Sequence, residues 1–468
     1  MNYPSLAKYT ALFGSQSVDE SPGKHLHDFI VAHPLVRFIR LQWQDHSGIV
    51  RARIIMPKRL LALTKALKPV HTPPIAFHCI VDNNLVPGLD PTGSHYLIPD
   101  WASLRLTPAQ PHYATVMCGV IGNTPSRLLP NLDLCPRLAL ANVMKTAAER
   151  FGIEFKVGFE VEFEVLRRVS STSSTIDGDG YDLMPAAEGL GRYAIDGLRD
   201  PIFSYIEEVI IELLDHGVDI EAVQTEGRRG QYELSLGPRS PLEAVDELIL
   251  VHDTLKTMIG RHGLVVTMAP KPFAARRQAT GQHTHISISD VTHEREFLAG
   301  ILHRLPSLCA TCMPYDLSYE RAQPYLGGNR VAWGTENREV PIRKIRPGHW
   351  EVRCVDATAN MYLALAAILG SGLLGIEQQQ RLTWPDTALP VRHCMDTDCS
   401  ETKATAPNSD LPRTLEEALQ QLEISSSELG TIMNSEILQH YLFVKNFEAA
   451  QIAKKDPQQV RNLLSALF

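Results

Sequence analysis

The sequence lacks several features that would place it in a well-known class at once. It contains no G-x-x-x-x-G-K-[ST] motif, which excludes a P-loop nucleotide site. The first residues show no basic region followed by an apolar core, so we expect no secretory signal. The eight cysteines are scattered without the spacing of a disulfide framework. This pattern favours unpaired thiols in a reducing, cytoplasmic environment.

The sequence also lacks a surplus of positive charge. The formal net charge is -8 at pH 7, and the pI is about 6.1. A protein that binds nucleic acid or an anionic membrane normally carries a basic surplus, so we expect neither partner. The 44% of hydrophobic residues and 21% of charged residues are typical of a globular protein, and 468 residues suffice for more than one domain.

One uncharged stretch, residues 357–376, is long enough to raise the question of a membrane span. It contains Asn360 and several glycines, so we interpret it as a buried core helix. The G-x-G-x-x-G pattern that begins at Gly370 lies inside this apolar run and not at a turn between a strand and a helix. It therefore predicts close helix packing and not a dinucleotide site.

Turn and helix signals divide the chain into three parts. Residues 1–26 form a polar leader. Residues 27–130 contain strand patterns, with a turn at 45–48, and predict a small β-rich domain. Pro136 is placed like the first residue of a helix and marks the start of a larger unit, residues 131–468, in which strands and helices alternate.

Four segments of the larger unit share one strand design. In each, apolar residues alternate with polar ones, so the polar side chains share one face of the strand. The acidic and imidazole groups on these faces are Glu160, Glu162, Glu233, His283, His285 and Glu351. For a single segment, a solvated polar face is the better interpretation. Four such segments together favour a shared site, because neighbouring strands of one antiparallel sheet would bring all of these groups onto one surface.

Such a density of negative charge needs compensation. Neighbouring carboxylates repel one another, and bound cations are the usual remedy. A ligand set dominated by oxygen with some imidazole favours Mg²⁺ or Mn²⁺ over Zn²⁺. Residues 338–353 also carry four arginines, which form either a solvated basic loop or clamps for phosphate and carboxylate groups. Metals combined with arginines are typical of phosphoryl transfer.

Several motifs, in this order, resemble the glutamine synthetase family. They are GFEVEFEV, TEGRRGQYELSL, MAPKPF, GQHTHISIS, SYER, WGTENREVPIRKI and EVRCVDATANMYLALAAIL, and the resemblance runs from about Pro34 to the C-terminus. The sequence is most similar to the branch that includes γ-glutamyl-amine ligases and domains of some fungal developmental proteins. The resemblance implies an α+β fold, with a small β-grasp-like N-terminal domain and a catalytic domain whose curved antiparallel sheet is flanked by helices. It also implies a ring-forming homo-oligomer, a decamer or dodecamer, with active sites between subunits.

The resemblance assigns a role to each candidate residue. The implied ligands of a first metal are Glu162, Glu226 and Glu233, and those of a second are Glu160, His283 and Glu351. Arg338 and Arg343 are the implied contacts to the transferred phosphate. His285 and Ser287 are the implied contacts to the nucleotide, and Arg321 and Arg353 are those to glutamate. ATP is the implied co-substrate, together with two to three Mg²⁺ or Mn²⁺ ions. The implied reaction forms γ-glutamyl phosphate and then a γ-glutamyl amide, as in glutamine biosynthesis and nitrogen metabolism.

The sequence departs from the family pattern where ammonium would bind. The family's F-D-G-S-S segment corresponds to FHCIVDNN here, with His78 in place of the aspartate, and no acid follows SYER. Ala279 also replaces a glycine of the loop that approaches glutamate. A buried cation needs a countercharge, so we expect an organic amine as acceptor. Two alternatives remain, a non-catalytic scaffold and an unrelated zinc hydrolase that uses the H-x-H pair.

Overall fold

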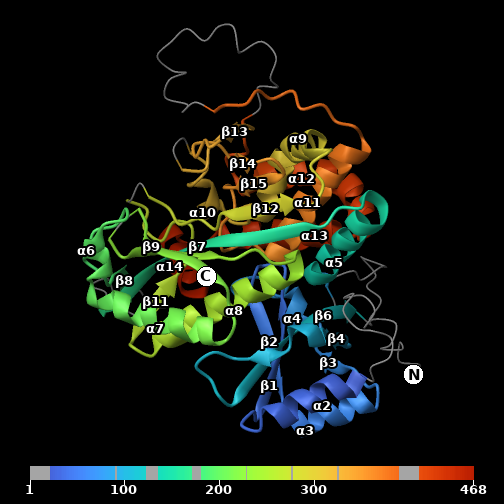
Figure 1. Ribbon diagram of the computed structural model, residues 1–468, viewed down its shortest axis with the longest axis vertical. Helices are drawn as coiled ribbons and strands as arrows, with labels where there is room; N and C mark the ends of the chain where they lie inside the picture. The colour runs from blue at the N-terminus through green and yellow to red at the C-terminus, as the bar shows by residue number, and fades with distance from the viewer. Residues whose placement is uncertain are drawn as a thin grey trace.

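Figure 1 shows the computed structural model, in which two β-sheets are each accompanied by helices. The structure describes residues 22–89, 92–122, 135–170, 181–227, 229–275, 278–323, 326–388 and 410–468. Helices and strands contribute to both parts of the chain, which confirms the expected α+β class.

The smaller sheet lies in the N-terminal part and has six strands. Their order is β2-β1-β6-β4-β3, with β5 paired to β6. The β1–β6 pair is parallel, and the other pairs are antiparallel. The strands are β1 (Phe38–Gln44), β2 (Val50–Ile55), β3 (Val70–Thr72), β4 (His95–Pro99), β5 (Arg105–Leu106) and β6 (Tyr113–Gly122).

Two helices supply the apolar residues that cover this sheet. Leu26 of the first helix and Leu60 of the second belong to the same buried cluster as Leu41 of β1. The predicted turn between β1 and β2 is present, and Gly48 adopts a φ of +83° there. The helices and helical turns of this part are α2 (Pro22–Ala32), α3 (Pro57–Lys65), α4 (Ile75–His78) and η2 (Trp101–Ser103).

The predicted domain limits are only partly covered by the described residues. The boundary placed at residue 27 falls inside helix α2, so the last residues assigned to the polar leader are helical. Residues 1–21 and the boundary at 130–131 lie outside the described residues. The exact division of the chain therefore stays a prediction.

The larger sheet has nine strands. The four polar segments are neighbours in it, as predicted. Its order is β13-β14-β15-β12-β7-β10-β9, and β8 and β11 also pair with β7. The four polar segments lie on β15, β12, β7 and β10, which are consecutive and antiparallel. The strands are β7 (Phe155–Ser170), β8 (Tyr181–Pro185), β9 (Ile220–Thr225), β10 (Gln231–Leu236), β11 (Leu264–Thr267), β12 (Thr284–Ile288), β13 (Trp333–Thr335), β14 (Ile342–Arg346) and β15 (His349–Val352).

Helices pack behind this sheet and between the two sheets. The predicted core helix is α11, and fifteen consecutive residues of it, from Met361 to Gly375, are buried. No helix within the described ranges is long and apolar enough to cross a membrane. The helices and helical turns are α5 (Pro136–Thr146), η3 (Ala147–Phe151), α6 (Ile195–Leu198), α7 (Pro201–Asp215), α8 (Pro241–Gly260), α9 (Glu294–Cys312), α10 (Asp316–Tyr319), α11 (Met361–Glu377), α12 (Leu415–Met433), α13 (Ile437–Ile452) and α14 (Pro457–Leu467).

Glycines allow α9 and α11 to approach backbone to backbone, as the G-x-G-x-x-G pattern predicted. A Cβ atom added at Gly300 of α9 would lie 2.2 Å from the carbonyl oxygen of Ser371 and 2.7 Å from the Cα atom of Gly375. These distances are shorter than van der Waals contact, and both neighbours are backbone atoms that cannot rotate away. Glycine is therefore required at this crossing.

We predict that Gly300→Ala destabilises the protein. The added methyl group should force α9 and α11 apart and lower the free energy of unfolding by about 1–3 kcal/mol. Gly260→Ala is the matched control, because a Cβ atom there would meet no atom within 4 Å. That substitution should be neutral or stabilising, by up to about 1 kcal/mol. Urea unfolding of both variants measures the difference, and equal midpoints would contradict the close approach.

Candidate functional site

The register of the larger sheet aligns the candidate residues in rows. Glu233 on β10 lies directly opposite Glu162 on β7, and Glu351 on β15 lies opposite His285 on β12. Arg343 on β14 continues the second row beside Glu351. Directly opposed residues of neighbouring strands project to the same face. The acids, imidazoles and one guanidinium therefore share a surface.

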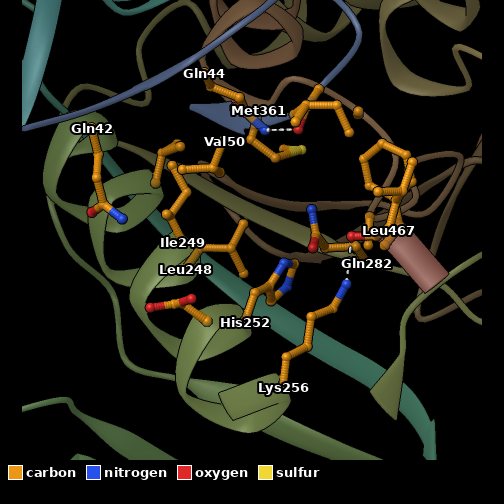
Figure 2. A pocket seen from close by; sticks show the side chains of 17 residues that line it. Gln42, Gln44, Val50, Leu248, Ile249, His252, Lys256, Gln282, Met361 and Leu467 are labelled. Atoms are coloured by element: carbon orange, nitrogen blue, oxygen red, sulfur yellow. Dashed lines mark hydrogen bonds between the residues drawn. The ribbon is translucent and has the colours of Figure 1, made fainter. Parts of the chain in front are cut away.

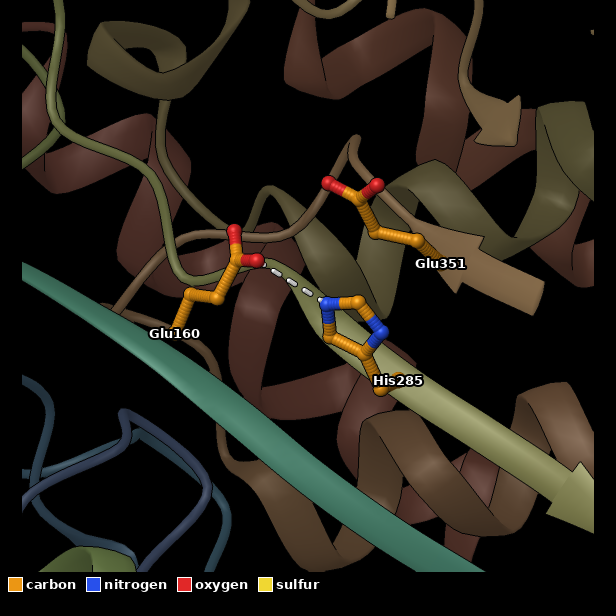
Figure 3. A group of neighbouring side chains, drawn as sticks. All are labelled: Glu160, His285 and Glu351. Carbon is orange, nitrogen blue, oxygen red and sulfur yellow. Dashed lines mark hydrogen bonds and ion pairs between the residues drawn. The ribbon is translucent and has the colours of Figure 1, made fainter. Parts of the chain in front are cut away.

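Two histidines connect the carboxylates. His283 Nδ1 lies 2.9 Å from one oxygen of Glu160 and 3.4 Å from an oxygen of Glu351. His285 Nε2 lies 3.1 Å from the other oxygen of Glu160. The two rings thus hold Glu160 at the centre of the surface, as Figure 3 shows for His285.

Arginines close one side of the cluster. Arg343 donates a hydrogen bond of 3.0 Å to Glu351, and Arg353 pairs with the other oxygen of the same carboxylate. Arg321, which follows α10, donates to the carbonyl oxygen of Val355 at 2.9 Å. These three guanidinium groups are buried. The planar fork of a buried guanidinium group suits pairs of oxygens, such as those of a carboxylate or a phosphate.

The balance of charge differs across the surface. Burial by itself would raise the pKa of Glu160, but hydrogen bonds from His283 and His285 outweigh this effect and hold the pKa well below its usual range. Burial likewise opposes ionisation of Glu351, whereas His283 and Arg353 lower its pKa. Glu160 and Glu351 are therefore ionised near neutral pH.

The opposite side of the surface has an excess of negative charge. Burial raises the pKa of Glu233 to about 9, and the charges of Glu160, Glu162 and Glu226 add to the effect. Burial and the charge of Glu162 also raise the pKa of Glu226. Without a cation, this side resists full ionisation. A divalent ion would remove that resistance.

Three side chains already meet the geometric requirement for sharing a metal ion. Glu160, His285 and Glu351 each offer a donor atom, and these atoms lie within 4.8 Å of one another (Figure 3). Carboxylate oxygens dominate the surrounding set, which suits Mg²⁺ or Mn²⁺, with imidazole as a minor ligand. This triad contains His285, whereas the family resemblance implied His283 in the same set.

Two residues that were predicted to contact the phosphate and the nucleotide, Arg338 and Ser287, lie away from the carboxylates. Arg338 is exposed, and its charge acts on the hydroxyl of Tyr193. Ser287 is half-buried further along β12, opposite His349. The structure therefore brings together the six implied metal ligands, His285 and three arginines, and leaves Arg338 and Ser287 at the margin.

Sequence reasoning missed several residues that shape this surface. Gln231 donates to Glu162 at 3.1 Å, and the backbone N–H of Gly281 donates to the same carboxylate oxygen at 2.9 Å. A Cβ atom at Gly281 would lie 2.6 Å from Nη2 of Arg321. Gln231 lies on the polar face of its strand, so the alternation of the sequence could have identified it as part of the surface. Only the tertiary structure shows the need for a glycine at residue 281.

Tyr193 is a second residue that the sequence did not reveal. The amide of Gln224 bridges the Tyr193 hydroxyl, at 3.0 Å, and Glu233, at 2.9 Å. Tyr193 and the preceding Arg192 both have positive φ angles, 62° and 57°. Such strained conformations are typical of functional turns. This turn holds an exposed aromatic ring beside the acidic side of the surface.

Comparison with known proteins gives a consistent picture. Residues 133–462 match the family model described as glutamine synthetase, catalytic domain. The structure of GmaS in complex with ADP has a TM-score of 0.75 and 24% identity, and the match covers 93% of this chain and 98% of GmaS. At this identity the likeness establishes a shared fold.

Three curated relatives are about 30% identical. Protein fluG of Emericella nidulans is 31% identical over 94% of this chain, which spans only 50% of the length of that protein. Gamma-glutamylpolyamine synthetase GlnA3 of Streptomyces coelicolor is 30% identical, covering 76% of this chain and 79% of the relative. Glutamate–isopropylamine ligase of Pseudomonas sp is 30% identical, covering 76% and 81%.

We predict that Glu233→Gln stabilises the metal-free protein at pH 8. A carboxyl group whose pKa is raised on folding favours the native state below its unfolded pKa, near 4.5, and this contribution is lost as the pH rises toward about 9. The amide cannot ionise, so the variant should gain about 1–3 kcal/mol over the parent at pH 8. Thermal melts at pH 5 and pH 8 measure the difference, which should be small at pH 5.

The same variant should respond less to divalent ions. Mg²⁺ or Mn²⁺ should raise the melting temperature of the parent more than that of Glu233→Gln, because the variant has lost one anionic donor. Glu221→Gln on the neighbouring strand β9 is the control, since Glu221 is exposed. An identical response of all three proteins to the metal would refute the proposed site.

Proposed function

The chain belongs to the glutamine synthetase family, and on this basis we propose that it is an ATP-dependent ligase that joins an amine to the γ-carboxylate of glutamate. One observation carries the proposal. Four adjacent strands present acids and imidazoles on one face, and three buried arginines lie beside them. The family match excludes the alternative of an unrelated zinc hydrolase.

The cluster supplies the ligands for the ions that such a reaction needs. Glu160, His285 and Glu351 have donor atoms at suitable separations, and Glu162 and Glu233 face each other on the acidic side. We propose that two to three Mg²⁺ or Mn²⁺ ions bind among the six predicted ligands. Bound there, they would offset the charge of the phosphates of ATP.

The arginines suit the two anionic reactants. We assign Arg343 to the transferred phosphoryl group, and Arg321 and Arg353 to the carboxylates of glutamate. A γ-carboxylate oxygen of glutamate attacks the γ-phosphorus of ATP, and ADP leaves. The nitrogen of a neutral amine then attacks the acyl carbon, phosphate leaves, and the amine loses a proton. Fixed guanidinium groups stabilise the spreading negative charge, and holding the reactants together supplies proximity.

We propose an organic amine as the acceptor. The sequence has no acid at either position where the family pattern places one for ammonium. Two relatives are named for a polyamine and for isopropylamine. His78 is buried on α4 near His95 and His440, so within this chain it does not reach the carboxylate cluster. A ring-shaped oligomer and a cytoplasmic location stay predictions, the latter supported by five free, buried cysteines among the described residues, Cys79, Cys118, Cys309, Cys312 and Cys354.

A non-catalytic scaffold is the alternative. It predicts that ATP and Mg²⁺ together leave the melting temperature unchanged, whereas a ligase binds both and is stabilised. Retention of every predicted metal ligand and of the buried arginines supports the ligase.

We predict phosphate release that depends on glutamate, ATP, Mg²⁺ and an organic amine. The assay compares ammonium with methylamine, isopropylamine, putrescine and spermidine, and mass spectrometry identifies the amide. At least one organic amine should give a kcat/KM about tenfold or more above that of ammonium, because the ammonium site lacks a countercharge. Glu351→Gln is the inactive control. Efficient turnover of ammonium and none of the amines would refute the acceptor proposal.

We predict a separate effect of Arg343→Lys. Lysine keeps the charge but loses the planar fork, so the rate of phosphate release should fall by about 100-fold or more. Arg413→Lys is the control, because Arg413 is 80% exposed and pairs with Asp410 at the surface. An unchanged kcat in Arg343→Lys would show that this arginine has no role in the phosphoryl-transfer step.

A further inference from the structure

A cavity of about 280 Å³ lies on the other side of the catalytic sheet, at the junction with the N-terminal sheet. Strands β1 and β2, helix α8, the start of α11 and the final residues of the chain surround it, as Figure 2 shows. Its size suits a compact small molecule with an apolar body. None of the candidate catalytic residues lines it.

Most of the wall is apolar. Side chains from three separate elements contribute, among them Val50 of β2, Leu248 and Ile249 of α8, and Met361 of α11. The wall therefore favours a ligand with a hydrocarbon or aromatic body.

The polar part of the wall is rich in hydrogen-bond donors. Lys256 Nζ donates to the carbonyl oxygen of Leu467 at 2.5 Å, which leaves two of its N–H groups available. The nearest acid on the same helix, Asp253, forms an ion pair of 2.9 Å with Arg40. Asp253 also lines the cavity, and its charge partly offsets the effect of burial on Lys256, but the two side chains form no ion pair within 4 Å in the described parts of the chain. Burial accordingly lowers the pKa of its ammonium group to about 7.

Gln282 is the second polar group of the wall. Its side chain is almost completely buried, and neither amide atom has a hydrogen-bond partner of normal geometry in the described parts of the chain. The ring of His252 lies beside it, close enough to interact with the amide, but Nε2 of that ring likewise has no hydrogen-bond partner of normal geometry there. Buried polar groups are nearly always satisfied, so unsatisfied ones in a cavity wall point to a missing polar partner.

We propose that this cavity is a second ligand site, which binds a small monocarboxylic acid with an apolar body. The carboxylate accepts hydrogen bonds from Lys256 and from the amide of Gln282, and the apolar body packs against α8 and Met361. An anion here provides the countercharge that Lys256 lacks, and a neutral ligand does not. This site is distinct from the carboxylate cluster and from the proposed ligase reaction.

The cavity and the candidate active site are connected by one stretch of backbone. Gly281 donates to Glu162, His283 contacts Glu160, and Gln282 between them faces the cavity. A ligand in the cavity therefore touches a residue whose two neighbours belong to the carboxylate cluster.

Calorimetry on the intact protein without ATP tests the proposal. Benzoate and 4-methylpentanoate are the probes, and benzamide and benzylamine are the uncharged and cationic comparisons. The acids should bind, and the amide and the amine should bind at least about tenfold more weakly, since a charged hydrogen bond is lost. Equal binding of benzamide and benzoate, or no binding of either acid, would overturn the proposal.

Substitutions of Lys256 test whether the acids bind in this cavity. Lys256→Met should weaken benzoate binding by about 10- to 100-fold, whereas Lys256→Arg should keep most of it. Lys145→Met on the exposed face of α5 is the control and should not change it. Far-ultraviolet circular dichroism confirms that each variant is folded. Undiminished binding by folded Lys256→Met would place the acid elsewhere and refute the site. Because binding is measured without turnover, this outcome is independent of whether the ligase proposal holds.

Discussion

Repulsion between carboxylates on one face of a sheet is the constraint around which the catalytic part is arranged. Glu162 and Glu233 oppose each other directly, and Glu226 adds a third charge that raises the pKa of Glu233. Such an arrangement costs stability unless cations or hydrogen-bond donors compensate it. The fold provides histidines and arginines around Glu160 and Glu351, whereas Glu162 and Glu233 accept hydrogen bonds from neutral amide groups, which carry no compensating charge. The imbalance therefore indicates where a positively charged ion belongs.

Strand register is the means by which distant parts of the chain meet. The row Arg343, Glu351 and His285 joins three strands, and the next position in the row is Gly158 on β7. A side chain at residue 158 would occupy the surface beside His285. Its absence lets the carbonyl oxygen of Leu236 lie 3.0 Å from the place of a Cβ atom, so the register determines both which groups converge and where another part of the backbone can approach β7 closely.

Alternation of residues along single strands made much of this surface predictable. The polar faces of β7, β10, β12 and β15 follow from a period of two, and the antiparallel neighbourhood of these strands was a hypothesis that the structure confirms. The buried helix α11 and its close glycine packing were also predictable, because an uncharged run with small residues favours a core helix. Tyr193 was not predictable, because its position depends on a strained turn and on a bridge through Gln224. For Arg338, a sequence motif suggested a contact to the transferred phosphate. In this single chain the side chain is exposed and lies at the margin of the surface.

Alternation has a further consequence on the other side of the sheet. The alternation continues into the residues just before β12, where Gln282 lines the cavity and the next residue, His283, contacts Glu160. The polar groups of that cavity lie in an apolar wall, where an unpaired donor costs more than it would in water. A buried amide without a hydrogen bond of normal geometry and an ammonium without an ion pair within 4 Å, among the described residues, are therefore unfavourable in a purely structural role. A carboxylate ligand satisfies both, and the same backbone then carries a bound anion on one face and a cation-binding cluster on the other.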